Sequence, residues 1–184
     1  MSESLIIVLN GTSSAGKTSI ALALQDACPT PILYLGWDVF ASLITPAFLE
    51  ADPAANQAQW LRFVKGFYQA VGAVAAPGNH VIFDTVLQRP EDLPELQEAL
   101  AGQRVCYVGV HCPLDEAERR EAARGDRVVG TARMQHPIVH QRGAYDIEVD
   151  TTALSPAECA ERILAFLAAN SHPTAFWAAV PTPA

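Results

Sequence analysis

The chain has 184 residues, 50% hydrophobic and 17% charged, so it is long enough for one globular domain and too apolar to be disordered. Its net charge of −8 would repel a polyphosphate backbone, so nucleic acid is not an expected partner. Its apolar runs are too short to cross a membrane, and its four cysteines are scattered with no secretory signal ahead of them, so we expect a cytoplasmic protein.

Five short apolar runs, separated by helix-length segments, predict a parallel α/β sheet. They cover residues 5–10, 32–36, 80–85, 104–112 and 145–152. The first four are nearly continuous in apolar residues, whereas the last alternates apolar and acidic residues and is expected at a sheet edge. We expect one domain over residues 1–170 and a loose Pro- and Ala-rich tail over 171–184, attached if at all through Phe176 and Trp177.

A phosphate-binding motif follows the first run directly. Residues 11–18 read Gly-Thr-Ser-Ser-Ala-Gly-Lys-Thr, with a helical stretch beginning near Gly16. Backbone N–H groups and a helix N-terminus favour an anion here, Lys17 would reach the β- and γ-phosphates, and the Thr18 hydroxyl would bind Mg²⁺. The residues predicted to bind ATP are Gly11, Ser13, Ser14, Ala15, Gly16, Lys17 and Thr18.

Two carboxylates end predicted strands at the edge where a sheet of this kind binds its ligands. Asp38 follows the second run, where it would either orient the acceptor hydroxyl and take its proton or cap the next helix. Asp84 ends the third run, where a carboxylate holds Mg²⁺ or substrate, and a cap is again the alternative.

An apolar stripe predicts a helix over residues 57–76. The stripe packs against the core, walls a substrate pocket, or does both. We expect the acceptor to bind within about residues 38–76, where Arg62 and Lys65 are the only basic residues. The candidate acceptor contacts are Trp37, Asp38, Phe40, Trp60 and Asp84.

Residues 113–127 form a predicted helix within a lid over about 113–135. Arg124 and Arg127 are assigned to the triphosphate. Arg119 and Arg120 are assigned to a solvated face, because each follows an acidic residue at i,i+4 spacing. His140 is a weaker candidate for substrate contact, as is Tyr145.

These motifs together resemble the chloramphenicol phosphotransferase family, which are ATP-dependent kinases of an antibiotic hydroxyl. The resemblance spans roughly residues 5–160 and rests on the phosphate loop, Gly36 with Asp38, and residues 108–110, 123–128, 139–140, 145–146 and 148–152. It implies a P-loop kinase fold: a five-stranded parallel sheet with helices on both faces. It also implies that Asp38 is the catalytic base, that Arg124 and Arg127 are lid arginines, and that the loop after Thr152 helps to bind adenine.

The sequence therefore predicts transfer of the γ-phosphate of ATP, with Mg²⁺, to a small-molecule hydroxyl such as that of chloramphenicol. The catalytic residues would be Asp38, Lys17, Arg124 and Arg127, and Thr152 would contact the nucleotide. A kinase of a shikimate-like acid or a nucleoside is an alternative on the same scaffold. A GTP-binding switch is disfavoured, because no Asn-Lys-x-Asp or Asp-x-x-Gly motif follows the loop.

Overall fold

The computed structural model describes residues 4–49, 56–124, 129–141 and 143–179. Five parallel strands form a single sheet in the order β2-β3-β1-β4-β5. Their bounds are β1 Leu5–Asn10, β2 Ile32–Gly36, β3 His80–Thr85, β4 Arg104–His111 and β5 Ile147–Asp150. The predicted sheet is confirmed, with β5 at one edge; the fifth strand is shorter than expected.

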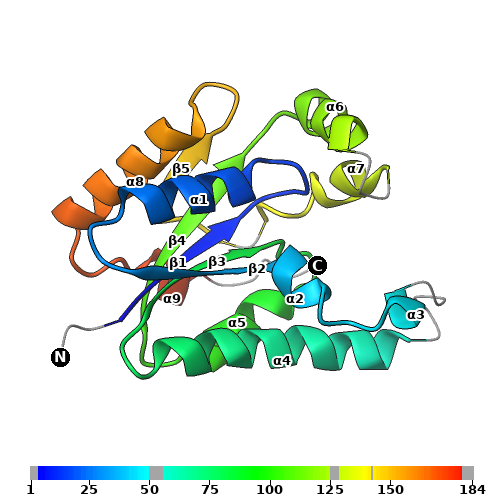
Figure 1. Cartoon of the computed structure of the whole chain (residues 1–184), viewed down its shortest axis with the longest axis horizontal. Helices are drawn as coiled ribbons and strands as arrows, with labels where there is room; N and C mark the ends of the chain where they lie inside the picture. The colour runs from blue at the N-terminus through cyan, green and yellow to red at the C-terminus, as the bar shows by residue number, and fades with distance from the viewer. Residues whose placement is uncertain (1–3, 50–55, 125–128, 142, 180–184) are drawn as a thin grey trace.

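Helices cover both faces of the sheet (Figure 1). α1 packs against α8 on one face, and α4 packs against α5 on the other. Within the described ranges, none of these helices combines the length and the apolar character that a membrane crossing requires. Their bounds are α1 Lys17–Ala27, α2 Trp37–Ala41, α3 Pro46–Leu49, α4 Gln57–Ala75, α5 Asp92–Ala99, α6 Leu114–Arg124, α7 Thr131–Gln135, α8 Pro156–Ala169 and α9 Ala175–Ala178.

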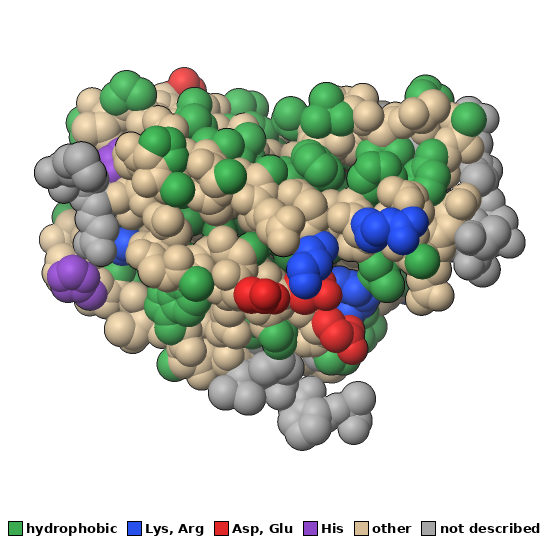
Figure 2. All heavy atoms as spheres, turned by 90° about the horizontal axis from the view of Figure 1, so that it is seen from below, with side chains coloured by type: hydrophobic (Ala, Val, Ile, Leu, Met, Phe, Trp, Pro, Cys, Tyr) green, Lys and Arg blue, Asp and Glu red, His purple; other side chains and the backbone are tan. Residues whose placement is uncertain are grey.

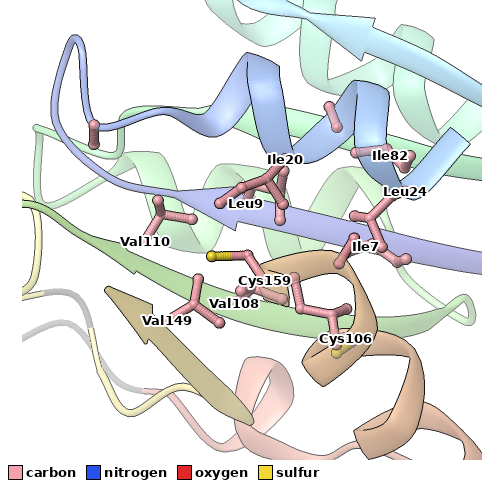
Figure 3. Close-up of a cluster of buried hydrophobic side chains, with 14 of the residues drawn as sticks. Ile7, Leu9, Ile20, Leu24, Ile82, Cys106, Val108, Val110, Val149 and Cys159 are labelled. Atoms are coloured by element: carbon pink, nitrogen blue, oxygen red, sulfur yellow. The ribbon is translucent and has the colours of Figure 1, made fainter. Parts of the chain in front are cut away.

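Alternate residues of the central strands build two separate cores. Ile7 and Leu9 of β1 point toward α1 and α8, where they meet Val108 of β4 and Cys159 of α8 (Figure 3). Ile6 and Val8 belong to the core on the opposite face. Because side chains alternate across a strand, a strand buried on both faces must be apolar throughout, as β1 is.

The α4 side completes the second core. The predicted stripe of α4 buries Val64, Phe67 and Val71 there, so the stripe does pack against the core. Figure 2 shows this side from outside, with most of its Lys, Arg, Asp and Glu side chains gathered in one group of mixed sign. Lys65 and Glu98, 3.8 Å apart, form an exposed ion pair between α4 and α5.

The chain after α8 differs from the loose tail expected from the sequence. Phe176 of α9 is fully buried in the second core. The Asp146 carboxylate accepts hydrogen bonds from two backbone N–H groups at the start of α9, and the Gln97 amide donates to the Phe176 and Ala179 carbonyls. Residues 171–179 are therefore part of the domain, because an aromatic side chain and satisfied backbone groups attach them to it.

Candidate active site

The carboxyl ends of the strands open into a cavity of about 690 Å³. We call one side the P-loop half, formed by cavity-lining residues between 13 and 20, 120 and 135, and 151 and 156. The other side is the aromatic half, formed by cavity-lining residues between 37 and 92. The division follows the strand order, because β2 and β3 lie on one side of β1 while β4 and β5 lie on the other. A sheet of this kind binds ligands at this edge.

The predicted phosphate loop curls around the N-terminus of α1. Ser14 has a φ of 60° and Gly16 a φ of 95°, which turns the loop before the helix begins. At Gly11 a side chain is excluded, because a Cβ would lie 2.4 Å from the Val110 carbonyl oxygen. Lys17 is buried, and its ammonium donates to the Gly11 and Thr12 carbonyls at 2.8 and 2.9 Å.

The loop fits a triphosphate by its chemistry. The Ser13 and Ser14 hydroxyls are buried, and neither has a hydrogen-bond partner among the described residues. A buried hydroxyl without a partner carries a desolvation cost that a phosphate oxygen would relieve. These hydroxyls, the Lys17 ammonium and the N-terminus of α1 together form a set of donors for an anion. Ala15, also predicted to bind ATP, is buried but does not line the cavity.

Asp84 connects three elements at the centre of the site. Its carboxylate accepts from the Tyr34 hydroxyl at 2.6 Å, from the Thr18 hydroxyl at 3.3 Å and from the Trp37 N–H at 3.2 Å. The last contact joins Asp84 of β3 to the first residue of α2, so Asp84 holds the start of that helix from a neighbouring strand. Thr18 and Asp84 supply the hydroxyl and carboxylate oxygens that Mg²⁺ takes in sites of this type, often with waters and phosphates.

Glycine at position 36 makes the Tyr34 contact possible. A Cβ at Gly36 would lie 2.2 Å from the Tyr34 hydroxyl oxygen, so any other residue would displace this side chain from Asp84. Burial, the Asp84 charge and the hydrogen bond to Asp84 all raise the pKa of Tyr34, so the hydroxyl stays protonated and donates. Sequence reasoning missed Tyr34, because nothing in a β-strand pattern shows which carboxylate a tyrosine will reach.

Asp38 lies in the first turn of α2, close to α6. The N-cap of α2 is Gly36, and no side chain caps it, so the expected alternative role of Asp38 as an N-cap is not what the structure has. One carboxylate oxygen of Asp38 lies 3.8 Å from a guanidinium nitrogen of Arg124 in α6. Both side chains line the cavity. The structure therefore brings together these two predicted residues; Arg127 lies outside the described residues.

Arg120 was assigned to solvent, and the structure contradicts this. Its guanidinium donates to the Thr151 hydroxyl and carbonyl at 2.9 and 3.0 Å and lines the cavity beside the P-loop. The expected pair with Glu116 does form, and hydrogen bonds from Arg119 and Arg120 lower the pKa of that carboxyl. The i,i+4 spacing identified one partner of Arg120 but could not show that its other nitrogens reach the chain 31 residues later.

The loop after β5 meets the cavity through Thr151 rather than through Thr152. The Thr151 hydroxyl donates to the Ala15 carbonyl at 2.9 Å, which ties this loop to the P-loop. The Thr152 hydroxyl donates to Asp150 at 2.6 Å and is exposed, and Thr152 does not line the cavity. Thr152 was predicted to contact the nucleotide, and the structure gives the cavity-lining position to its neighbour.

The short helix α7 is attached to the P-loop by Gln135. The Ser13 N–H donates to the Gln135 side-chain oxygen at 2.7 Å. Glu121, buried in α6, accepts from the Gly130 and Ala132 N–H groups at 2.7 and 2.9 Å and so anchors the start of α7. Sequence reasoning missed Gln135, because a lone glutamine on a short helix carries no motif.

The aromatic half has a wall of indole and phenol rings. Trp37 and Trp60 line the cavity and meet edge to face with ring centroids 5.4 Å apart, and Tyr68 lines the cavity as well. Phe40 was predicted to contact the acceptor, but it does not line the cavity; it stacks on Phe67 at 4.1 Å over the core. Phe40 therefore supports the wall from behind.

A basic residue that sequence reasoning missed also lines this half. Arg89, in the β3–α5 loop, donates to Asp92 and Glu95, whereas Arg62 and Lys65 of α4 do not line the cavity. Burial opposes the charged form of Arg89, but the two carboxylates outweigh it and raise the pKa of the guanidinium. The cation that lines this half therefore comes from outside the segment over 38–76, in which the acceptor was expected to bind.

His140 and Tyr145 are packed outside the cavity, among the residues that support the base of the P-loop. The Asn10 amide donates to the Tyr145 hydroxyl at 2.8 Å, and that hydroxyl meets His140 Nδ1 at 2.8 Å. Burial, aided by the charges of His111, His136 and Lys17, lowers the pKa of His140 to about 4. The packed alternative, rather than substrate contact, describes both side chains.

The fold of the chain is similar to that of solved kinases of the P-loop class. The APS kinase of Mycobacterium tuberculosis, solved with AMPPNP and APS, superposes with a TM-score of 0.70 at 16% identity, over 90% of this chain and 98% of that one. A shikimate kinase from Acinetobacter baumannii, solved with shikimate, gives a TM-score of 0.55 at 15% identity, over 90% and 93%. The chain thus has the P-loop kinase fold.

Sequence comparison narrows this class to one family. A family model described as chloramphenicol phosphotransferase-like protein matches residues 4–168, and the chain belongs to this family. It is 34% identical to a Mycobacterium tuberculosis protein named "Putative O-phosphotransferase", over 96% of this chain and 88% of that protein. The predicted family is confirmed, and the protein is an ATP-dependent kinase.

Proposed function

We propose that this kinase transfers the γ-phosphate of ATP to a hydroxyl group of chloramphenicol or of a similar drug-like alcohol. The observation that carries the proposal is the position of Asp38. Its carboxylate lies in the cavity between the phosphate loop and the aromatic wall, 3.8 Å from Arg124 of the lid helix. A candidate base, a cation and a candidate phosphate site therefore line the same cavity.

The P-loop half would hold the donor. Lys17 and the Ser13 and Ser14 hydroxyls bind the phosphates, and Arg124 approaches the γ-phosphate from the lid. Thr18 and Asp84 would hold Mg²⁺, which when bound neutralises charge on the phosphate oxygens. The protein contributes mainly position and electrostatic stabilisation, because phosphoryl transfer passes through a loose transition state.

Asp38 would act on the acceptor. Its carboxylate orients the hydroxyl and takes the hydroxyl proton while the oxygen forms its bond to the γ-phosphorus. The bond between the γ-phosphorus and the bridging oxygen breaks, and ADP leaves with that oxygen. The products are the phosphorylated alcohol, ADP and one proton carried by Asp38.

The aromatic half supports an acceptor that carries a ring. Trp37 and Trp60 offer flat apolar surface, and a few polar groups nearby would fix the orientation of the bound molecule. Family membership points to the same kind of acceptor.

An acceptor screen tests the proposal. The purified chain is incubated with ATP, Mg²⁺ and one alcohol at a time, and both ADP release and the phosphorylated product are measured. We expect turnover of chloramphenicol and none by the Lys17→Ala variant, which loses the ammonium of the phosphate loop. Strong turnover of shikimate or a nucleoside, with none of chloramphenicol, would replace the proposed acceptor. ADP release without a phosphorylated product would contradict acceptor transfer altogether.

A further inference from the structure

The charged residues that line the described cavity divide by sign. In the P-loop half they are the cations Lys17, Arg120 and Arg124. In the aromatic half they are the carboxylates Asp38, Asp84 and Asp92, with Arg89 as the one cation. A triphosphate matches the first half, because it is strongly anionic. The aromatic half has the opposite balance of charge, because carboxylates outnumber cations there. Whether the Arg89 guanidinium can act as a counter-ion therefore decides which acceptors this half can bind.

Arg89 is held rigidly by the start of α5. Asp92 is 4% exposed, and one of its oxygens accepts from the Gln88 and Arg89 N–H groups, each at 2.8 Å. Its other oxygen accepts from Nε of Arg89 at 2.8 Å and also from Nη2. Both oxygens are thus engaged, and the backbone and the side chain of Arg89 are fixed by the same carboxylate.

A second carboxylate also neutralises the charge of the Arg89 guanidinium. Glu95, one turn along α5, accepts from Nη2 of Arg89 at 3.0 Å. Two negative charges therefore surround one positive charge. The contacts leave Nη1 of Arg89 without a hydrogen-bond partner among the described residues, while the side chain is 30% exposed and lines the cavity. The guanidinium still presents N–H donors, but its charge is already balanced.

We propose that Arg89, clamped by Asp92 and Glu95, selects acceptors by charge: it donates to an uncharged oxygen of the acceptor and gives no counter-ion to an anionic one. The inference rests on the proposed phosphotransfer and specifies its acceptor. A carboxylate or phosphate that approached Arg89 would find the charge of the guanidinium already balanced by Asp92 and Glu95, and would lie close to these two carboxylates. The contrast is with the APS kinase of the same fold, whose solved complex holds the anion APS.

Three forms of one aryl diol test the inference, because they differ in charge and share their hydroxyl groups. The neutral form is chloramphenicol, the cationic form is the amine left when its acyl group is removed, and the anionic form is the N-succinyl derivative of that amine. Their Kd values are measured by calorimetry on the full chain with AMPPNP and Mg²⁺. We expect the anion to bind at least about tenfold more weakly than the neutral form.

Two variants assign the effect to the clamp. Glu95→Gln removes one carboxylate and keeps the shape of the side chain, so the anion should bind about threefold or more tightly while the Kd of chloramphenicol stays within about twofold. Glu98→Gln is the matched control, because Glu98 lies on the same helix, is exposed and pairs with Lys65. It should leave all three Kd values unchanged.

The outcomes separate this inference from the proposed function. If the succinyl derivative binds and turns over as well as chloramphenicol, the charge selection is wrong while the phosphotransfer stands. An unchanged preference in Glu95→Gln, or an equal change in Glu98→Gln, removes the role of the clamp. If none of the three forms binds, the proposed acceptor fails, and shikimate is compared with its methyl ester: tighter binding of the ester supports the inference, and any other result overturns it.

Discussion

At the scale of single residues, Asp38 carries the proposed chemistry. We predict that Asp38→Asn keeps nucleotide binding and lowers kcat about a hundredfold or more, because the amide cannot accept the hydroxyl proton. The measurements are kcat for the acceptor and Kd for AMPPNP. Asp26→Asn is the control, since Asp26 is an exposed acid on α1 that does not line the cavity.

A smaller decrease in kcat for Asp38→Asn would define the role of Asp38 differently. Phosphoryl transfer is loose and proton removal can come late, so a catalytic base contributes less there than in acyl transfer. A loss of less than about tenfold would show that Asp38 positions the hydroxyl without accepting its proton. A change in KM with kcat unchanged would point to acceptor binding alone.

His140 gives the folded state a pH dependence. Its folded pKa of about 4 lies below the unfolded value of 6.5, so protonation favours the unfolded chain. This contribution to stability is present above about pH 6.5 and is lost as the pH falls toward 4. We predict that Tm decreases over that window and that His140→Gln flattens the decrease. His172→Gln, at an exposed histidine, should leave the slope unchanged.

At the scale of elements, α7 is tied to the phosphate loop by Gln135 and by the Thr12 hydroxyl, which donates to the Ala132 carbonyl at 3.3 Å. Gln135→Leu would leave the Ser13 N–H without the acceptor that it has at 2.7 Å. We predict an increase in KM for ATP of roughly tenfold, with a fall in Tm of only a few degrees. Steady-state kinetics and a thermal melt check this, with Gln69→Leu on exposed α4 surface as the control. An unchanged KM would make Gln135 a packing residue.

The sequence predicts an element well when the residues of that element alone form a recognisable pattern. β1 and the turn into α1 are readable because a continuous apolar run leads directly into the glycines and Lys17. Tyr34 and Gln135 act through contacts between segments far apart in the chain, and no local period encodes such a pairing. Arg89 pairs with nearby Asp92 and Glu95, but no local pattern shows that it lines the cavity. Side chains of this kind are visible only after the sheet order places their segments together.

At the scale of the whole molecule, α9 completes the second core. Phe176 is fully buried against the sheet, whereas Trp177 next to it is 40% exposed. We predict that Phe176→Ala lowers the free energy of unfolding by about 3–5 kcal/mol, because it leaves a cavity in the core. Trp177→Ala should cost clearly less. Urea unfolding of both variants checks this, and equal losses would contradict the assigned packing.

The sequence named Phe176 and Trp177 as the possible attachment of the tail, and Phe176 is indeed fully buried. The loose character expected for residues 171–179 was wrong for a physical reason. Residues 171–184 are rich in Pro and Ala and show little periodicity, which usually indicates a mobile end. No local sequence pattern shows that Phe176 fills a space left by α4, α5 and β4. Nor does one show that the Asp146 carboxylate accepts hydrogen bonds from the start of α9. The composition of a segment reflects only that segment, whereas residues 171–179 are held in place by contacts with the rest of the domain.

The placement of the three tryptophans gives the protein its own optical probe. Trp37 and Trp60 are in the wall of the cavity, and Trp177 does not line it. In a Trp177→Phe background, indole emission would come only from that wall, so a nitroaromatic ligand would quench it on entry. Acceptor binding could then be followed in real time by stopped-flow fluorescence, without attaching a dye.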